Sequence, residues 1–461
     1  MSNITHKVSS LLDRHLVFPL LDFLLQKEAY PEKDLLSAKY ELLKATNMID
    51  AANSIYQQIH STEDNSPVEA KRAQVLENYE SLQYSSAKVL EILQDPSVLA
   101  LLKQDKLAAR SFLETKFEFT NEMLDTLYDF AQCQYQIGSY QGAADLLFDY
   151  RVLSTNPEKS TMALWGKLSC DILLQKWDVA LEDLLKLKDI IDSPPAAVAN
   201  QGPNNTQQLI QRSYFVAWSL FVFFNHPKGR DILIDTFMQP PYISTIQTTC
   251  PWALRYLTAS IVTTKNRRKN NLLKELVKLV ASERELKLSR STPQEVEEPL
   301  TGFIYTLYSE YNFSEAHKSL AQCEPVLDHD FFLESIKKEF LETARTMVFE
   351  SYVKVYREID IGVLSATLGL SRDEGEKWVV DLVRGVRMDA KIDSESNTVI
   401  MGAQYTSVFQ NVIERTRNLT FRTNLLASNI EKRETELANR RTGATSGDAK
   451  KEGKKGGARK Q

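Results

Sequence analysis

The sequence predicts a mainly α-helical fold: a helical-repeat solenoid of the tetratricopeptide (TPR-like) type, then a winged-helix domain and a long C-terminal helix. Apolar residues follow a helical period through the first 350 residues. A pattern of one large, one small and one aliphatic residue recurs. After residue 358 the pattern changes to short helices and two strand-like stretches.

The composition is that of a globular protein without disulfides. The chain has 461 residues, 43% hydrophobic and 25% charged, and a net charge of −5. At about 150 residues per domain, this length predicts two to four units. Its four cysteines are isolated and form no CxxC pair, so neither a disulfide framework nor a thiolate zinc site is expected. A reducing compartment, the cytoplasm, is therefore the expected location.

No membrane segment is expected. The N-terminal stretch contains Asp13, Arg14, Pro19 and Asp22, which a secretory signal peptide would lack. The longest apolar run, Tyr214 to Phe224, is too short to cross a bilayer.

Amphipathic helices are predicted in sequence over residues 34–47, 49–59, 68–93 and 121–137, after an apolar stripe that includes His15 and Leu16. In the recurring pattern a small alanine three residues after a large side chain lets two helices approach closely. Gly138 is expected to end a helix in the left-handed conformation. Such repeats indicate a stacked helical solenoid. The four matches are Tyr140–Ala143–Leu147, Trp177–Ala180–Leu184, Met48–Ala51–Ile55 and Phe313–Ala316–Leu320.

Breaks in the pattern divide the chain. A Pro-, Asn- and Gln-rich stretch predicts a linker, and a Gly- and Lys-rich end, with six basic and two acidic side chains after residue 442, predicts a disordered basic tail. The predicted parts are a repeat domain (1–192), a linker (193–208), a second domain (209–402), a C-terminal helix (403–441) and the tail (442–461). The second domain divides into a helical part (209–357) and a winged helix (358–402).

The winged-helix domain is predicted from a helix, a turn, a second helix and a hairpin. A short helix is expected over 359–368, and Ser371 with Glu374 forms a capping box for the next helix. Two strands follow, and their open edge favours binding of another chain, although Ile392 and Val399 could simply pack on Trp378. The predicted partner-binding residues are Ala390, Lys391, Ile392, Asp393, Thr398, Val399, Ile400 and Met401.

The C-terminal helix carries an apolar seam with alternating steps of four and three, interrupted by Thr416, Thr423 and Arg433. A seam this long favours a partner helix, and packing back onto its own domain is the alternative. The residues predicted to bind a partner here are Tyr405, Phe409, Val412, Leu419, Leu426, Ile430 and Leu437.

No catalytic, cofactor-binding or metal-binding residues are predicted. The six histidines form no HExxH motif, and the sequence has neither a phosphate-binding loop nor a nucleophile elbow. Hence no enzyme activity and no small-molecule substrate is expected.

Nucleic-acid binding has weak support. The second helix of the winged-helix domain carries four basic and five acidic residues, which argues against insertion into a groove. Lys265, Arg267, Arg268 and Lys269 form a basic cluster that is either an exposed loop between helices or an RNA contact. The basic tail has the same two interpretations.

Helical repeats followed by a winged helix resemble the PCI domain of scaffold subunits. The strings HKVSSLLDRHLVFPLLDFL from His6 and YDFAQCQYQIGSYQGAADLLFDYRVLS from Tyr128 are similar to the family of E subunits of eukaryotic translation initiation factor 3. WALRYLTAS from Trp252 and AKIDSESNTVIMG from Ala390 share this similarity, which runs from about residue 5 to 440.

The resemblance implies a non-catalytic scaffold that interlocks with other initiation factor subunits through winged-helix edges and a bundle of C-terminal helices. It also implies binding to the small ribosomal subunit and support of mRNA recruitment. Two alternatives stay open: a PCI subunit of the proteasome lid or signalosome, and a winged-helix regulator that binds nucleic acid directly.

Overall fold

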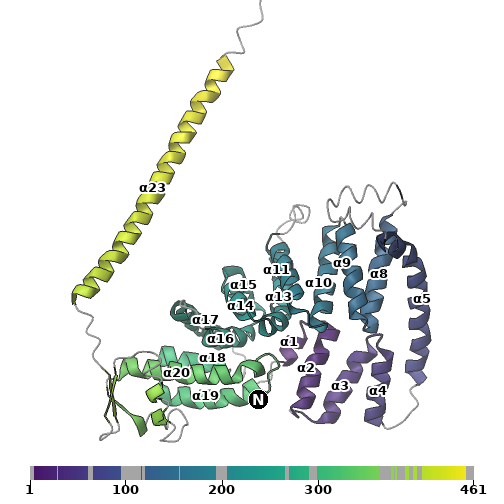
Figure 1. Ribbon diagram of the computed structural model, residues 1–461, viewed down its shortest axis with the longest axis horizontal. Helices are drawn as coiled ribbons and strands as arrows, with labels where there is room; N and C mark the ends of the chain where they lie inside the picture. Colours follow the sequence, from purple (N-terminus) through teal and green to yellow (C-terminus); the bar gives the residue numbers. More distant parts are fainter. Residues whose placement is uncertain are drawn as a thin grey trace, which may run out of the picture. The chain divides into compact units, whose positions relative to one another are not determined.

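A computed structural model shows an almost entirely helical chain with one small sheet, which confirms the predicted fold class (Figure 1). The chain forms two compact units: residues Met1–Tyr356 with Val363–Gly375, and residues Arg357–Gly362 with Glu376–Gln461. The structure describes residues 5–28, 30–60, 66–94, 116, 120–154, 156–193, 205–264, 269–289, 298–356, 358–362, 375–377, 379–381, 390–393, 398–401 and 408–452.

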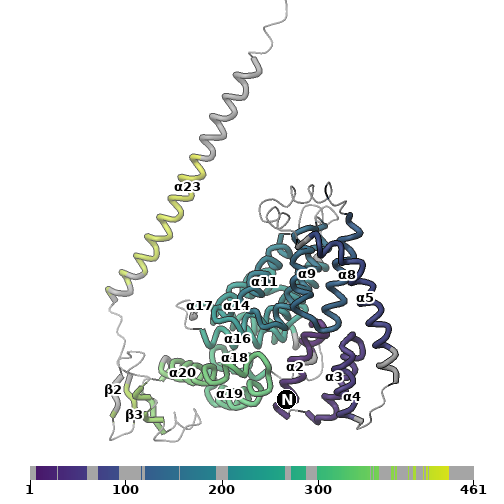
Figure 2. The backbone as a smooth tube through the Cα atoms, turned by 45° about the vertical axis from the view of Figure 1, so that its right-hand side comes forward, coloured from purple at the N-terminus to yellow at the C-terminus, as the bar shows by residue number. Residues whose placement is uncertain are grey.

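The first half of the first unit is a row of helices in which, from α2 onward, each packs on the next (Figures 1 and 2). These helices are α1 (Thr5–Ser9), α2 (Arg14–Gln26), α3 (Glu32–Lys44), α4 (Ile49–His60), α5 (Ser66–Gln94), α8 (Asn121–Ile137), α9 (Tyr140–Leu153), α10 (Pro157–Leu173) and α11 (Trp177–Asp192).

The second half continues the same helical packing. Its elements are α13 (Asn205–Asn225), α14 (Gly229–Phe237), α15 (Pro240–Thr248), α16 (Ala253–Thr263), α17 (Lys269–Ser289), α18 (Pro299–Tyr305), the π-helix η1 (Thr306–Glu310), α19 (Phe313–Asp328), the 3-10 helix η2 (Glu334–Ile336) and α20 (Lys337–Val355). Helix α11 packs directly on α13, so the packing continues across the predicted linker. Residues 205–208, which we predicted as linker, lie in the first turn of α13, since nothing after Pro203 in that stretch opposes a helix.

The repeat pattern places its alanines at helix crossings. Ala143, Ala180 and Ala316 are all fully buried near the starts of α9, α11 and α19. The fourth match is shifted by one residue, because Ala52 rather than Ala51 is the buried alanine of α4. A buried methyl group allows the backbones to approach, and the larger residues that follow fill the space beside it.

Gly138 ends α8 as the sequence predicts. Its φ of 98° is left-handed, and its N–H caps the helix by bonding back to the preceding turn. A side chain built at this position would come within 3.2 Å of the Met48 methyl group. The turn between α8 and α9 therefore requires a residue that tolerates positive φ.

Helix α2 ties the two halves of the first unit together. Its buried His15 contacts the Tyr140 hydroxyl through Nδ1 at 3.0 Å, and burial lowers the pKa of this histidine. At the other end of α2, the Phe23 ring packs edge-on against Phe331 at 5.6 Å, and Lys27 pairs with Glu334. One N-terminal helix thus contacts both the repeats and the segment that precedes α20.

A buried ion cluster holds the second half of this unit. Arg255 of α16 has 2% of its side chain exposed and pairs with Glu298 and with Asp330, the latter at 3.0 Å. Asp330 also accepts a hydrogen bond from the Tyr256 hydroxyl at 3.1 Å. Because a buried charge is stable only when paired, this cluster fixes α16 against the start of α18 and the segment before η2.

The second unit contains a three-stranded antiparallel sheet and one long helix. The strands are β1 (Glu358–Asp360), β2 (Ala390–Asp393) and β3 (Thr398–Met401), in the order β1-β3-β2, and the helix is α23 (Val408–Glu452). Strands β2 and β3 have the bounds that the sequence predicts. The short helix predicted to begin at residue 359 is wrong at its start, because Ile359 pairs with Val399 as part of β1.

Helix α23 ends at Glu452, beyond the end near residue 441 that we predicted. The added segment contains alanine, lysine and glutamate, which favour helix, and no proline. Its two glycines weaken the helix without ending it.

We predict that Gly138→Ala lowers the free energy of unfolding by about 1–2 kcal/mol, the cost of a left-handed conformation for an L-residue. Gly138→Asn should cost less, because asparagine tolerates this conformation while introducing the same Cβ next to Met48. Urea denaturation of the full chain measures both. Equal losses for alanine and asparagine would show that steric contact, not the backbone angle, requires the glycine.

Candidate partner-binding surfaces

The sheet has one buried and one exposed face. Ile359, Val399 and Ile392 are paired across the three strands, and Ile359 and Val399 are fully buried. Glu358 and Ile400 lie on the face opposite Ile359 and Val399, since successive residues of a strand point to opposite sides. Ile400 is 37% exposed at the centre of this face. Among the hairpin residues whose side chains are described, Ile400 is the accessible apolar one.

The order of the strands corrects the prediction of an open edge. We predicted a two-stranded hairpin, in which β3 would have a free edge, but β3 lies between β1 and β2 and is paired on both sides. Strand β2 lies at an edge of the described sheet and remains the strand to which another chain could add. Residues 398–401 could contact a partner through side chains only.

Helix α23 exposes the apolar side chains predicted for its seam. Phe409 is 80% exposed, and Val412, Leu419, Leu426 and Ile430 are each more than half exposed. Tyr405 lies outside the described residues, and Leu437 lies within α23 but its side chain is not described. The described part of the stripe extends over about six turns along one side of the helix, with Thr416 and Thr423 between its apolar residues.

Three exposed apolar residues of α23 lie outside the predicted seam: Ile413, Phe421 and Leu425. Ile413 adjoins the seam, whereas Phe421 and Leu425 lie one turn apart on the other side of the helix. Both residues could have been identified from the sequence, because they are large apolar residues that fall outside the seam's steps of four and three. The apolar surface of α23 is thus wider than the predicted seam.

The basic cluster is mostly outside the described residues. Lys265, Arg267 and Arg268 fall there, and Lys269 begins α17. The basic tail beyond residue 452 also falls there. For RNA contact these residues remain a prediction from sequence.

No catalytic arrangement stands out in the described part of the chain. A cavity of about 370 Å³ lies beside α5 and α8, and its nine lining residues include four amides and a single carboxylate, that of Asp129. Within the described ranges, no group of three or more metal-ligating side chains comes together. None of the described helices has the length and apolarity of a membrane span. The four cysteines are buried and free.

Comparison with known proteins decides the family. Three family models match successive parts of the chain: the eIF3 subunit 6 N terminal domain at residues 3–134, the PCI domain at 320–403, and the C-terminal model of the E subunit of eukaryotic translation initiation factor 3 at 407–427. The chain is 44% identical to the E subunit of eukaryotic translation initiation factor 3 from Aspergillus fumigatus over 438 residues, 93% of each chain. It is 41% identical to the same protein of Sclerotinia sclerotiorum over 442 residues, 94% of each chain.

The chain belongs to the family of E subunits of eukaryotic translation initiation factor 3. The predicted function, a non-catalytic component of this translation initiation factor, is confirmed by this membership. Membership of this family also excludes the alternative that the chain is a proteasome-lid or signalosome subunit with the same PCI architecture. The C-terminal family model covers the stretch of α23 in which most of the exposed apolar residues lie.

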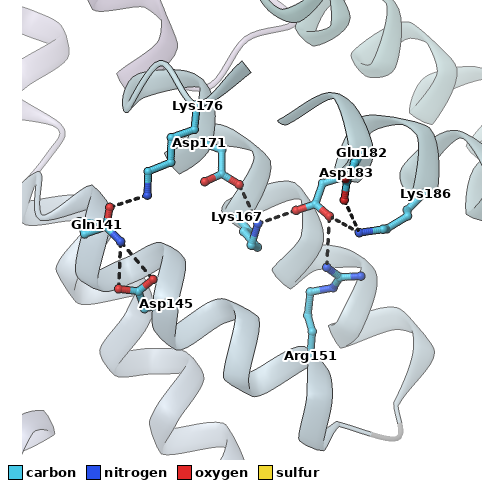
Figure 3. Close-up of polar contacts among 9 residues, drawn as sticks. All are labelled: Gln141, Asp145, Arg151, Lys167, Asp171, Lys176, Glu182, Asp183 and Lys186. Carbon is cyan, nitrogen blue, oxygen red and sulfur yellow. Dashed lines mark hydrogen bonds and ion pairs between the residues drawn. The ribbon is translucent and has the colours of Figure 1, made fainter. Parts of the chain in front are cut away.

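Beyond these surfaces, this member of the initiation factor 3 family has a buried charged network that the sequence did not reveal (Figure 3). Lys167 of α10 donates to Asp171 at 2.7 Å and to Asp183 of α11 at 2.6 Å, and less than a tenth of each of the three side chains is exposed. Asp183 also accepts from Lys186 at 3.0 Å, and Arg151 of α9 approaches it at 4.0 Å. The network could have been suspected from Asp183, because this charged residue lies within the apolar stripe of α11.

The network joins three successive helices by charge rather than by shape alone. Burial by itself would raise the pKa of the Asp183 carboxyl, but hydrogen bonds from Lys167 and Lys186 outweigh burial and lower this pKa. Since the folded pKa is lowered, the stabilisation is present above the unfolded pKa and is lost as pH falls through the folded value. The stack of α9, α10 and α11 therefore depends on Lys167.

We predict that Lys167→Met destabilises the protein by about 3–5 kcal/mol, because two buried carboxylates lose their shared partner. The matched control is Lys159→Met, since Lys159 pairs with Asp125 at 2.6 Å with both side chains about half exposed. That loss should be within about 1 kcal/mol. Urea denaturation at neutral pH measures both. Equal, small losses would show that the network does not hold the three helices.

Proposed function

We propose that residues 357–461 attach this chain to the rest of initiation factor 3, with α23 as the main joint and the sheet as a second one. The observation that carries the proposal is the exposed apolar stripe from Phe409 to Ile430. Other subunits of the factor are the proposed partners, since they are the proteins with which a member of this family assembles.

The exposed stripe is costly unless another polypeptide covers it. Fully burying a valine, leucine, isoleucine or phenylalanine side chain is worth about 1.5–3 kcal/mol, so the five such residues of the stripe amount to a large driving force before ordering costs are subtracted. A helix with this pattern buries its seam against a second helix. A bundle of C-terminal helices from several subunits is therefore the proposed setting of α23.

The sheet offers a smaller surface. The outer edge of β2 has the geometry to pair with a strand, and Ile400 adds an apolar contact on the exposed face. A partner that adds a strand to β2 could cover Ile400 with the side chains of that strand.

For the factor as a whole, we propose that this chain supports binding to the small ribosomal subunit and recruitment of mRNA in the cytoplasm. Lys265, Arg267, Arg268, Lys269 and the basic tail are the proposed RNA contacts, because phosphate binding depends on clustered lysine and arginine. The body of the chain is acidic, which argues against a general nucleic-acid binder.

We predict that Leu419→Asp combined with Leu426→Asp leaves the chain folded but prevents its incorporation into the factor. Two carboxylates in the seam would have to be desolvated when a partner helix packs there. Quantitative mass spectrometry of subunits that co-purify with the tagged full-length chain measures incorporation, and circular dichroism measures folding.

The matched control adds the same two charges away from the seam, by Asn418→Asp and Ser428→Asp, which are both exposed. This variant should incorporate normally. Undiminished co-purification with the seam variant would remove α23 as the joint.

We predict that Ile400→Asp reduces co-purification of partner subunits with little change in melting temperature, because Ile400 is accessible while its neighbour is buried. Val399→Asp is the contrasting variant and should destabilise the sheet itself, since Val399 is fully buried. Normal co-purification with a soluble Ile400→Asp chain would exclude the exposed face of the sheet as a contact.

A further inference from the structure

The two borders of the α23 seam differ in chemistry. Numbering the seam as a heptad places Phe409, Thr416, Thr423 and Ile430 at position a. Val412, Leu419, Leu426 and Arg433 then occupy position d. The positions that flank this seam, e and g, are the ones that form ion pairs with a partner helix.

Up to residue 430, position e is uncharged and largely apolar, whereas position g carries two arginines; beyond residue 430, Glu434 at e and Glu436 at g are acidic. Ile413, Thr420 and Ala427 occupy e, and Arg415 and Arg422 occupy g, followed by Asn429. Both arginines are exposed in the described part of α23. From residue 408 to 430 the sequence has one acidic residue, Glu414, and it lies at position f, away from the seam.

We propose that the helix covering the α23 seam belongs to a different protein of the factor and carries acidic side chains opposite Arg415 and Arg422. This inference rests on the proposed role of α23 as the joint and specifies the chemistry of its partner. Covering the stripe brings the partner's flanking positions next to both arginines. Acidic residues there supply charge-assisted hydrogen bonds, and basic residues would repel.

A second copy of this chain fits the seam poorly. In a parallel, in-register copy neither arginine faces a carboxylate, because the acids on the seam borders, Glu434 and Glu436, lie beyond residue 430. A parallel copy would place Thr420 opposite Arg415 and Ala427 opposite Arg422. Two positively charged borders would then lie at one interface without compensation.

The test reverses the charge on one border of the helix in the full-length, tagged chain expressed in cells. Arg415→Glu with Arg422→Glu should reduce the co-purified amount of at least one other subunit by about tenfold, the effect of about 1.4 kcal/mol. The matched control, Arg417→Glu with Lys432→Glu, makes the same change of charge at positions b and c, and should leave co-purification within about twofold of wild type.

A second measurement identifies the partner residues. In the purified factor, Arg415→Lys with Arg422→Lys keeps the charge and provides amines that a carbodiimide couples directly to adjacent carboxylates. The expected cross-links join residues 415 and 422 to Asp or Glu of one other subunit, seven residues apart in its sequence or nearly so.

The outcomes separate this inference from the proposed function. If the Leu419→Asp, Leu426→Asp variant fails to incorporate while Arg415→Glu with Arg422→Glu incorporates fully, the joint stands and the acidic partner is wrong. If both variants incorporate fully, the joint itself is wrong and the inference falls with it. Cross-links from residues 415 and 422 to a second copy of this chain would also overturn the inference.

Discussion

Burial of one apolar face on each helix is the constraint on which this structure depends. In the first unit the constraint is met within the chain, because each helix covers the face of its neighbour and the alanines at the crossings allow close approach. In α23 the same kind of face is present and remains exposed. The difference between these two regions is what makes one of them a scaffold and the other a candidate joint.

Charge sets the alignment of the helices that apolar packing brings together. The network around Lys167 joins α9, α10 and α11, and the cluster around Arg255 joins α16 to the start of α18 and to the segment before η2. Both require particular partners at particular positions, unlike leucine contacts, which tolerate sliding. On α23 the borders of the seam carry charge without such partners in the described residues, and we infer that the partner protein supplies them.

Much of the fold could be predicted from the sequence, because helical periodicity and glycine conformation are local properties. The end of α8 at Gly138 and the bounds of β2 and β3 follow from residues within a few positions of each other. The helix predicted at Ile359 is wrong, because the strand conformation of this residue depends on pairing with Val399, forty residues away. The network around Lys167 could not be predicted for the same reason, since its members are on three helices.

For the candidate partner-binding surfaces, too, local features could be predicted from the sequence and features that depend on distant residues could not. The exposed stripe of α23 could be found from the spacing of apolar residues alone. The central position of β3 in the sheet could not, because it depends on pairing with β1. As a result, β2 is the hairpin strand that keeps an open edge in the described sheet. Family membership confirms the complex to which the chain belongs, and it does not name the residues that make contacts there.

The most direct test of the central claim is hydrogen–deuterium exchange of α23, measured in the isolated chain and in the purified initiation factor. Amides from Phe409 to Ile430 should exchange rapidly in the isolated chain and be strongly protected in the factor, because the stripe is covered only by other subunits. Equal protection in the two states would mean that the chain covers this helix by itself, which contradicts the account.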